Sequence, residues 1–183
     1  MKTMTKMIAS AFTAVAIFIG TNVKAQTTPA NALRFGIGLE TGIPVGNNIS
    51  DFSNFELGGT ARLQYGVSNN LALTLTSGYY NFFGKDYTID GLTHSARDLG
   101  LVPLKAGIKA FFAENVYFGA EVGAGFETKE RFPGAEKQTK LILSPAIGWA
   151  NKTWDVGVRY ENFSGQSNNY GLVGLRVAYG FGL

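Results

Sequence analysis

The sequence predicts an all-β fold, an eight-stranded antiparallel up-and-down barrel whose strands cross a membrane. Three observations predict it: apolar residues alternate with polar or small ones, the alternating segments are long, and short and long connections follow one another in turn. Strands of soluble proteins usually run about 5 or 6 residues, whereas a tilted strand needs roughly 9 to 11 residues to cross a bilayer. The predicted strands have the longer size, which favours transmembrane strands.

The segment Asp98–Glu127 shows the alternation most clearly. Its two halves flank a short break at 113–115, and each half has apolar residues on one parity and glycine or charged residues on the other. The apolar parity consists of Val102, Leu104, Ala106, Ile108, Ala110 and Phe112, followed by Val116, Phe118, Ala120, Val122, Ala124 and Phe126. This period of two predicts a hairpin of two long strands joined by a tight turn.

Three strands are predicted before this hairpin, at 33–41, 56–67 and 71–79, because apolar residues alternate through each range. The segment Pro44–Asn54, rich in Gly, Asn, Ser and Asp, predicts a loop between the first two. Ser68–Asn70 predicts a tight turn before the third, since Asn tolerates the left-handed backbone that hairpin turns need.

Two further loops flank the central hairpin. The longest break, Asn81–Arg97, is polar with scattered aromatic residues, and Thr128–Gln138 is charged and contains Pro-Gly. Alternation predicts the last three strands at 140–149, 154–161 and 170–183. A short turn at Asn151–Thr153 precedes the seventh strand, and the polar loop Asn162–Asn169 precedes the eighth.

Long and short connections therefore alternate strictly along the chain. Short turns on one side of the membrane and long loops on the other are typical of outer-membrane barrels. Aromatic residues on the apolar parity fall near strand ends, where interfacial belts form. The predicted interfacial aromatics are Tyr65, Tyr79, Phe112, Phe126, Trp149, Trp154 and Tyr179.

The composition agrees with this architecture. The 183-residue chain has 24 glycines and 13% aromatic residues, which suits coiled strands with aromatic girdles. It has no cysteine, which excludes disulfides, cysteine nucleophiles and thiolate metal sites. The formal charge is +3, but removing Lys2, Lys6 and Lys24 with the expected signal peptide leaves 13 Lys and Arg against 13 Asp and Glu. A neutral mature chain predicts no nucleic-acid partner.

The chain is predicted to divide into a secretory signal peptide at 1–25, a short polar lead-in at 26–32 and the barrel domain at 33–183. The signal peptide combines a basic start, an apolar run at 7–20 and a small residue at its end, Ala25. Such a run is short for a membrane-spanning helix, which needs about 20 residues.

The polar parity predicts a barrel interior filled by charged side chains. Eight strands enclose a space that side chains alone can fill, so opposite charges would meet there in an ion-pair network. The predicted network comprises Arg34, Glu40, Glu56, Arg62, Lys105, Lys109, Glu121, Glu127, Asp155, Arg159, Glu161 and Arg176. The balanced signs favour a structural plug. The alternative is a gated path or proton-linked site built from paired carboxylates such as Glu121 and Glu127.

The sequence predicts no catalytic, cofactor-binding or metal-binding residues. His94 and Ser95 suggest a hydrolase, since some eight-stranded barrels modify lipids with Ser and His, but a nucleophile needs a base oriented by a third group. Asp86, Asp90 and Asp98 are near them only in sequence. The Gly-x-Gly pairs fall within predicted strands, so they are not dinucleotide fingerprints, and no cofactor is expected.

Three segments carry a family likeness: YGVSNNLAL at Tyr65–Leu73, LVPLK at Leu101–Lys105 with its Phe-Phe strand end, and YGFGL at Tyr179–Leu183. On these segments the mature chain resembles the small outer-membrane β-barrel proteins of the OmpA and OmpX type, and specifically the porin-family barrels common in Bacteroidetes. The resemblance implies an integral outer-membrane protein of a Gram-negative cell envelope. It implies no catalytic residues.

The predicted function is that of a non-enzymatic outer-membrane barrel with a structural or surface-interaction role, because long loops on a rigid scaffold carry specificity. The predicted partners are outer-membrane lipid, an extracellular partner at the loops, and the barrel-assembly machinery through the C-terminal strand. Family members often end on an aromatic residue that this machinery reads; here Leu183 takes that place and Phe181 lies two residues before it. We expect a monomer.

Three alternative functions stay open from the sequence. A soluble periplasmic binder of lipocalin type would have the same strand count but would point its apolar rows inward around a hydrophobic ligand. A lipid-modifying barrel enzyme would use His94 and Ser95. A narrow porin would conduct solutes, although eight strands leave little room for a pore.

Overall fold

The computed structural model describes residues 28–46, 49–50, 52–89, 92–129, 136–165 and 169–183. The predicted signal peptide at 1–25 lies outside these residues. The strands are β1 (Leu33–Val45), β2 (Ser53–Ser68), β3 (Leu71–Gly84), β4 (Asp86–Ile89), β5 (Leu92–Ser95), β6 (Leu99–Phe111), β7 (Val116–Glu127), β8 (Thr139–Ala150), β9 (Trp154–Ser164) and β10 (Tyr170–Gly182).

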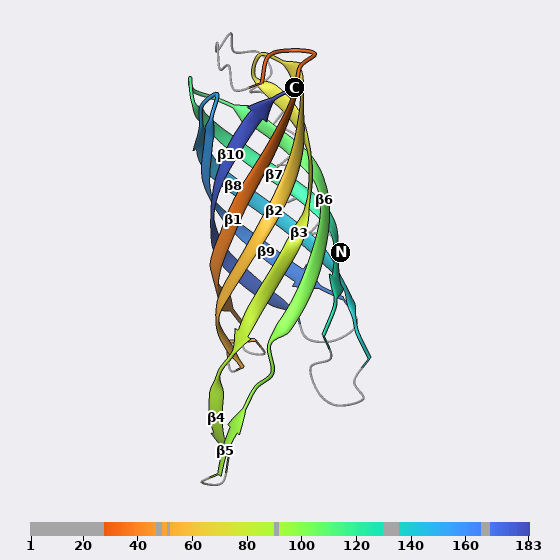
Figure 1. The fold of residues 1–183 in the computed structure, drawn as a ribbon, viewed down its shortest axis with the longest axis vertical. Coiled ribbons are helices and arrows are strands. Elements are labelled where there is room, and N and C mark those ends of the chain that lie inside the picture. The colour runs from red at the N-terminus through yellow and green to blue at the C-terminus, as the bar shows by residue number, and fades with distance from the viewer. Residues whose placement is uncertain (1–27, 47–48, 51, 90–91, 130–135, 166–168) are drawn as a thin grey trace, which may run out of the picture.

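Eight of these strands form a closed antiparallel barrel, in which sequential neighbours pair and β1 closes on β10 (Figure 1). The closing pair runs in unbroken register from Arg34 opposite Gly182 to Val45 opposite Gly171. The barrel strands are 11 to 16 residues long. The predicted fold, an eight-stranded up-and-down barrel, is thereby confirmed.

The two ends of the barrel differ in their connections. At one end, here called the turn end, the strands are joined at 69–70, 112–115 and 151–153. At the other, the loop end, the connections span 46–52, 85–98, 128–138 and 165–169. Figure 1 shows the C-terminus at the turn end, and β4 and β5 extending away from the barrel at the loop end. The predicted segregation of short and long connections is present.

The prediction that Asn81–Arg97 is a single loop is wrong. β3 continues to Gly84, and β4 and β5 pair as a separate two-stranded sheet. In β3 the continuation was hidden because Phe82 and Phe83 are both apolar although they lie on opposite faces. In the hairpin, Thr88-Ile89 and Leu92-Thr93 flank the dipeptide Asp90-Gly91, a combination that favours a hairpin and that the polar composition obscured.

Smaller differences occur at other strand ends. β1 extends to Val45 and β2 begins at Ser53, so the first loop is shorter than Pro44–Asn54. β9 continues to Ser164, into the predicted loop Asn162–Asn169. These strand ends are longer than predicted because they pair with neighbouring strands, and such pairing cannot be read from the alternation of residues along one strand.

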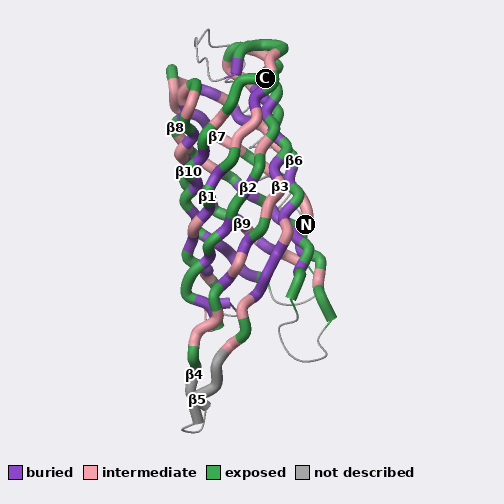
Figure 2. Tube along the Cα trace, viewed as in Figure 1, coloured by how far each residue is buried: buried purple, intermediate pink, exposed green. Residues whose placement is uncertain are grey.

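The period of two is expressed as a difference in burial between the two faces of each strand. Figure 2 shows buried and exposed residues alternating along the barrel strands. On β1, Leu39 is 68% exposed on the outer face while the next residue, Glu40, is 1% exposed inside the barrel. The outer face is apolar on all eight barrel strands, and the inner face carries the charged residues.

The start of the described chain covers part of the turn end. The backbone amide of Asn31 donates to the Gly66 carbonyl oxygen over 2.8 Å, and the Gly66 amide donates to Ala32 over 3.0 Å. The side chain of Gln64 donates to Thr28, which is buried. Residues 28–32 of the predicted lead-in are therefore bonded to the end of β2.

Some glycines allow neighbouring strands to approach closely as the barrel coils. A Cβ atom on Gly123 of β7 would lie 2.0 Å from the carbonyl oxygen of Leu104 and 2.6 Å from the Cα atom of Lys105 on β6. By contrast, a Cβ atom on Gly59 of β2 would meet only the Gly38 carbonyl oxygen, at 4.0 Å. The two glycines therefore differ in their tolerance of a side chain.

We predict that Gly123→Val destabilises the barrel by about 1 to 3 kcal/mol or prevents folding, because the new side chain collides with backbone atoms that cannot move independently. The matched control is Gly59→Val, which fills open space on a strand where valine is favourable. Urea unfolding of the protein in lipid vesicles, followed by tryptophan fluorescence, measures both. Equal stability of the two variants would contradict the close approach of β6 and β7.

Candidate functional site

Eight charged side chains form a closed ring inside the barrel, in which each neighbour carries the opposite sign. We call this set the charge ring. It runs through Arg62, Glu121, Lys105, Glu161, Arg159, Glu40, Arg176 and Asp155, which closes it on Arg62. The members come from β1, β2, β6, β7, β9 and β10, so the ring links strands that are distant in sequence.

One half of the ring joins β2 to β9 through β6 and β7. Nη2 of Arg62 lies 3.0 Å from Oε2 of Glu121, and Nζ of Lys105 lies 3.6 Å from the same oxygen. Lys105 also pairs with Glu161, whose Oε1 lies 3.2 Å from Nε of Arg159. The Lys105 and Glu161 side chains are 1% and 0% exposed, so this pair is shielded from water.

The other half returns through β1 and β10. Arg159 pairs with Glu40, and Oε1 of Glu40 lies 3.0 Å from Nε of Arg176. Nη1 of Arg176 lies 3.3 Å from Oδ2 of Asp155, and Nη1 of Arg62 lies 3.7 Å from that oxygen. Each ring member thus has two partners of opposite charge.

Further donors bind the ring carboxylates. Hydroxyl groups donate over 2.6 Å from Thr60 to Glu40, 2.7 Å from Thr76 to Glu121 and 2.7 Å from Tyr117 to Asp155. Lys109, outside the ring, donates to Asp155 over 2.5 Å. Burial of charge is tolerated only when partners replace the lost water, and these contacts supply them.

The cavities described beside the charge ring are small. Two cavities lined by its members have volumes of about 20 and 10 Å³. A cavity needs roughly 10 to 15 Å³ to hold one water molecule. These cavities are therefore of the size of single waters.

Three of the twelve predicted network residues lie outside the ring and its Lys109 partner. Arg34 is near the turn end, where it donates to the Asn151 carbonyl oxygen over 2.7 Å. Glu127 is at the loop end of β7 and accepts a hydrogen bond from the amide of Gln138. Glu56 is fully buried, and among the described residues neither of its carboxylate oxygens has a hydrogen-bond partner.

The structure does not bring Glu121 and Glu127 together as paired carboxylates. Glu121 belongs to the charge ring and contacts Arg62 and Lys105, whereas Glu127 lies at the loop end of the same strand. One further buried charge, Lys140 on β8, was not included in the predicted network. Its place on the polar parity of that strand was the available signal.

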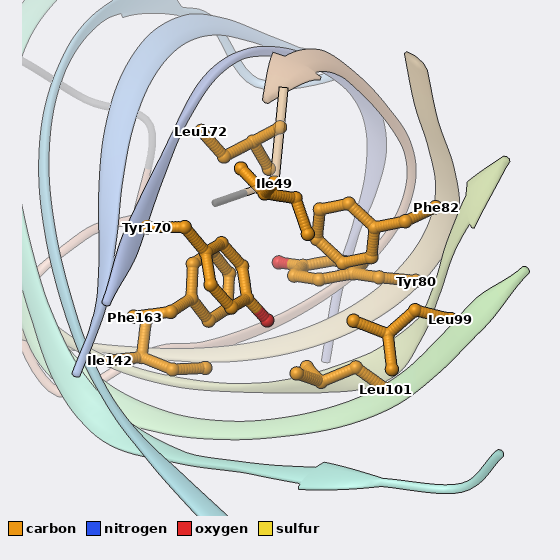
Figure 3. Packing of buried hydrophobic residues seen from close by; sticks show 9 residues of the cluster. All are labelled: Ile49, Tyr80, Phe82, Leu99, Leu101, Ile142, Phe163, Tyr170 and Leu172. Atoms are coloured by element: carbon orange, nitrogen blue, oxygen red, sulfur yellow. The ribbon is translucent and has the colours of Figure 1, made fainter. Parts of the chain in front are cut away.

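An apolar cluster, here called the apolar stopper, fills the interior on the loop side of the charge ring. It consists of Ile49, Tyr80, Phe82, Leu99, Leu101, Ile142, Phe163, Tyr170 and Leu172. Figure 3 shows these side chains converging from opposite walls. The rings of Phe163 and Tyr170 stack with centroids 4.8 Å apart, and Phe82 meets both edge-on at 6.0 Å. This cluster was not predicted from the sequence, although Tyr80 continues the inner parity of β3.

A smaller apolar cluster lies on the turn side, formed by Phe111, Tyr117 and Ala150. The Nζ of Lys109 lies 4.0 Å from the centroid of the Tyr117 ring, a cation–π contact. The charge ring is therefore bounded by apolar layers on both sides, which shield its ion pairs from bulk water.

The predicted interfacial aromatics lie on the outer face. Tyr65, Phe112, Trp149, Trp154 and Tyr179 lie near the turn end, and Tyr79 and Phe126 toward the loop end. At the turn end the rings contact each other, with Trp154 and Tyr179 meeting edge-on at 5.4 Å. At the loop end Phe55 and Phe83 add a stacked pair at 6.1 Å.

The residues considered for catalysis lie at the loop end. The backbone of His94 and Ser95 belongs to β5, and their side chains are outside the described structure. Asp98 accepts hydrogen bonds from the Gly84 amide and the Asn81 side chain, which hold the pKa of its carboxyl below the usual value.

No group of three or more His, Asp or Glu side chains in the described ranges is placed to hold a metal ion. No helix in those ranges is long and apolar enough to cross a membrane.

Comparison with solved structures identifies the class of fold. The chain is similar to the crystal structure of Ail, the attachment invasion locus protein of Yersinia pestis, with a TM-score of 0.56 at 15% identity, covering 83% of this chain and 99% of that one. The structure of Ail in a phospholipid bilayer nanodisc gives a TM-score of 0.53 at 16% identity, with 80% and 99% covered. The outer membrane protein OprG from Pseudomonas aeruginosa gives 0.51 at 8% identity, with 87% and 99% covered.

No protein family model matches the chain, and no curated protein matches its sequence. At these low identities the structural likeness establishes the fold alone. The chain has the fold of the small eight-stranded outer-membrane β-barrels. The finer resemblance to the porin-family barrels of Bacteroidetes stays a prediction.

We predict that Lys105→Met destabilises the barrel by about 3 to 5 kcal/mol, because it leaves the fully buried Glu161 without its closest partner. The double variant Lys105→Met with Glu161→Met removes both charges and should recover part of that loss. The control is Lys129→Met: Lys129 lies 3.9 Å from Asp98, both are about half exposed, and its loss should cost under about 1 kcal/mol.

Urea midpoints of the refolded protein in lipid vesicles measure all three variants. A double variant that is less stable than Lys105→Met alone would contradict a coupled pair inside the barrel. A loss for Lys105→Met no larger than that of Lys129→Met would contradict the shielding of the charge ring from water.

Proposed function

We propose that this protein is a non-enzymatic integral barrel of the outer membrane, with a closed interior and with loops that serve surface interaction or envelope integrity. One observation carries the proposal: the apolar outer face surrounds the whole barrel while the charges pair inside it. A contiguous exposed apolar surface of this extent marks an interaction surface. Because apolar residues face outward on every barrel strand, the environment that suits this surface is a lipid bilayer.

The arrangement argues against the lipocalin-type alternative. A soluble barrel that binds a hydrophobic ligand needs apolar rows facing an internal cavity. Here the inner parity carries the charge ring and the apolar stopper, and the cavities beside the ring are the size of single waters.

The same interior supports a plug rather than a porin. A solute would have to pass the apolar stopper and then separate buried ion pairs that have two partners each. Breaking a buried pair costs several kcal/mol because the remaining charge stays buried. A steady open path through the barrel is therefore unfavourable.

The loop end is the part that supports an interaction role. Four connections gather there, and the β4–β5 hairpin extends beyond the barrel (Figure 1). Binding residues often occur on loops held by a rigid scaffold, and a closed barrel is such a scaffold. An extracellular partner would therefore bind at the loop end. The closed barrel has no open sheet edge through which a second copy could pair, which suits a monomer.

Assembly would start from the C-terminal strand. β10 closes the barrel against β1 through twelve paired positions, from Arg34–Gly182 to Val45–Gly171. Phe181 and Leu183 lie exposed on the outer side near the chain end. These two residues are the candidates for recognition by the barrel-assembly machinery.

The test is membrane fractionation combined with gel mobility. We expect the mature protein to stay with outer-membrane fractions after salt washing, and to migrate faster unboiled than boiled, because a closed barrel resists unfolding by detergent. The purified protein in a planar bilayer should pass no steady current.

Release by salt washing with no mobility shift would contradict the membrane-embedded barrel. A stable current would leave the barrel intact but contradict its closed interior. The two parts of the proposal can therefore fail separately.

A further inference from the structure

The outer face of the barrel contains an apolar groove. Its volume is about 820 Å³, and it crosses β1, β2, β3 and β10. Gly59, Ala61 and Ser77 form its floor because their small side chains leave the surface low, while Leu39, Tyr79 and Tyr179 form its walls. None of its lining residues is charged.

The polar atoms of this groove are already satisfied. The hydroxyl of Ser77 donates to the Pro103 carbonyl oxygen over 2.9 Å, and that of Thr60 points inward to Glu40. A Cβ atom on Gly59 would meet only the Gly38 carbonyl oxygen, at 4.0 Å. The groove therefore offers an occupant shape and dispersion contacts, but no hydrogen bonds.

A second depression, of about 540 Å³, lies at the loop end between the ends of β6 and β7. Arg97, Asp98, Thr128, Lys129 and Lys137 line it, which gives three cations and one anion. The anion is already engaged, because Lys129 lies 3.9 Å from Asp98. Arg97 and Lys137 are exposed and form no ion pair with any described residue.

Tyr79 connects the two features. Its side chain lines the apolar groove. Its hydroxyl lies over Gly100: a Cβ atom on that glycine would be 2.2 Å from the Tyr79 oxygen and 2.4 Å from Oγ1 of Thr128. Thr128 lines the basic depression, so the depression begins where the tyrosine ring ends. An aromatic residue with a polar tip is typical of the boundary between acyl chains and headgroups.

We propose that these two features together bind one membrane lipid of net negative charge, with an acyl chain in the groove and a headgroup phosphate at Arg97 and Lys137. The proposal rests on the membrane location proposed above. The guanidinium group matches a phosphate with two parallel hydrogen bonds, and basic residues near the bilayer surface attract anionic lipids.

The shape of the groove favours a lipid over a second barrel. Lipid tails are as apolar as the groove, so the gain comes from packing rather than from the hydrophobic effect. A flexible acyl chain can follow the channel between the walls, whereas the wall of a second barrel is rigid and cannot adapt to it. Leaving the groove empty would forfeit dispersion contacts along its whole floor.

The experiment is native mass spectrometry of the refolded full-length mature protein in detergent micelles, with phosphatidylglycerol or phosphatidylcholine added. The gel mobility shift first establishes that each sample is a folded barrel. We expect preferential retention of phosphatidylglycerol. Arg97→Gln with Lys137→Gln should weaken its binding by about tenfold or more, because two favourable charges are lost. Gly59→Leu should also weaken it, because the new side chain occupies the floor of the groove.

Two matched controls separate the site from general effects. Lys152→Gln removes an exposed charge at the turn end, and Ala120→Leu enlarges a small outer residue on β7, away from the groove. Both should bind phosphatidylglycerol like the parent protein.

Several outcomes would overturn the proposal. Equal binding of the two lipids, or unchanged binding in either test variant, would contradict a site that joins groove and headgroup. Displacement of the lipid by millimolar inorganic phosphate would identify a small-anion pocket instead. A dimer in micelles that Gly59→Leu dissociates would identify the groove as a contact between two copies.

Discussion

Opposite demands on the two faces of each strand determine this structure. In the proposed membrane location a charged side chain outside the barrel would meet lipid, and inside it would meet a space too narrow for bulk water, so the charges must lie inside and must find partners there. The charge ring meets this demand with eight residues from six strands, each contacting two of opposite sign. Because the contacts cross between strands distant in sequence, a complete ring requires the whole barrel to be closed.

The apolar layers on either side of the charge ring separate its ion pairs from bulk water. At the loop side the stacked rings of Phe163 and Tyr170 and the edge-on ring of Phe82 close the interior with carbon atoms. At the turn side Phe111 and Tyr117 take this role. The ion pairs therefore form where water is excluded, which strengthens each pair and raises the cost of losing one partner. The apolar groove lies on the outer face of the barrel, where the proposed occupant is a lipid.

The face on which each charged side chain lies could be predicted from the sequence, because the alternation of residues along a strand is a local property. Every predicted inner charge, from Arg34 to Arg176, lies on the inner face, since a side chain in a strand can point only to one side or the other. The order of contacts within the ring was not accessible. Which carboxylate meets Arg62 depends on strand register and barrel tilt, and these arise only when all eight strands have paired.

The features that the sequence analysis missed have physical reasons of the same kind. Tyr80 and Phe82 lie on the inner parity, but beside the outward Tyr79 and Phe83 they produce a continuous aromatic run with no visible period. The β4–β5 hairpin is short, and its polar composition resembles that of a loop. Glu56 was assigned to an ion-pair network, yet it is buried without a hydrogen-bond partner among the described residues, which no pattern of charges along the chain foretells.

The central claim, apolar face to lipid and charged face inward, can be tested directly by spin labels along β10. The chain has no cysteine, so single cysteines at 173, 174, 175, 177 and 178 can be labelled without a background, and Arg176 is left in place because it belongs to the charge ring. In lipid vesicles, labels at 173, 175 and 177 should collide with oxygen, which dissolves in the bilayer, and those at 174 and 178 should be inaccessible. Accessibility of 173, 175 and 177 to a water-soluble nickel reagent, or no period of two, would contradict the account.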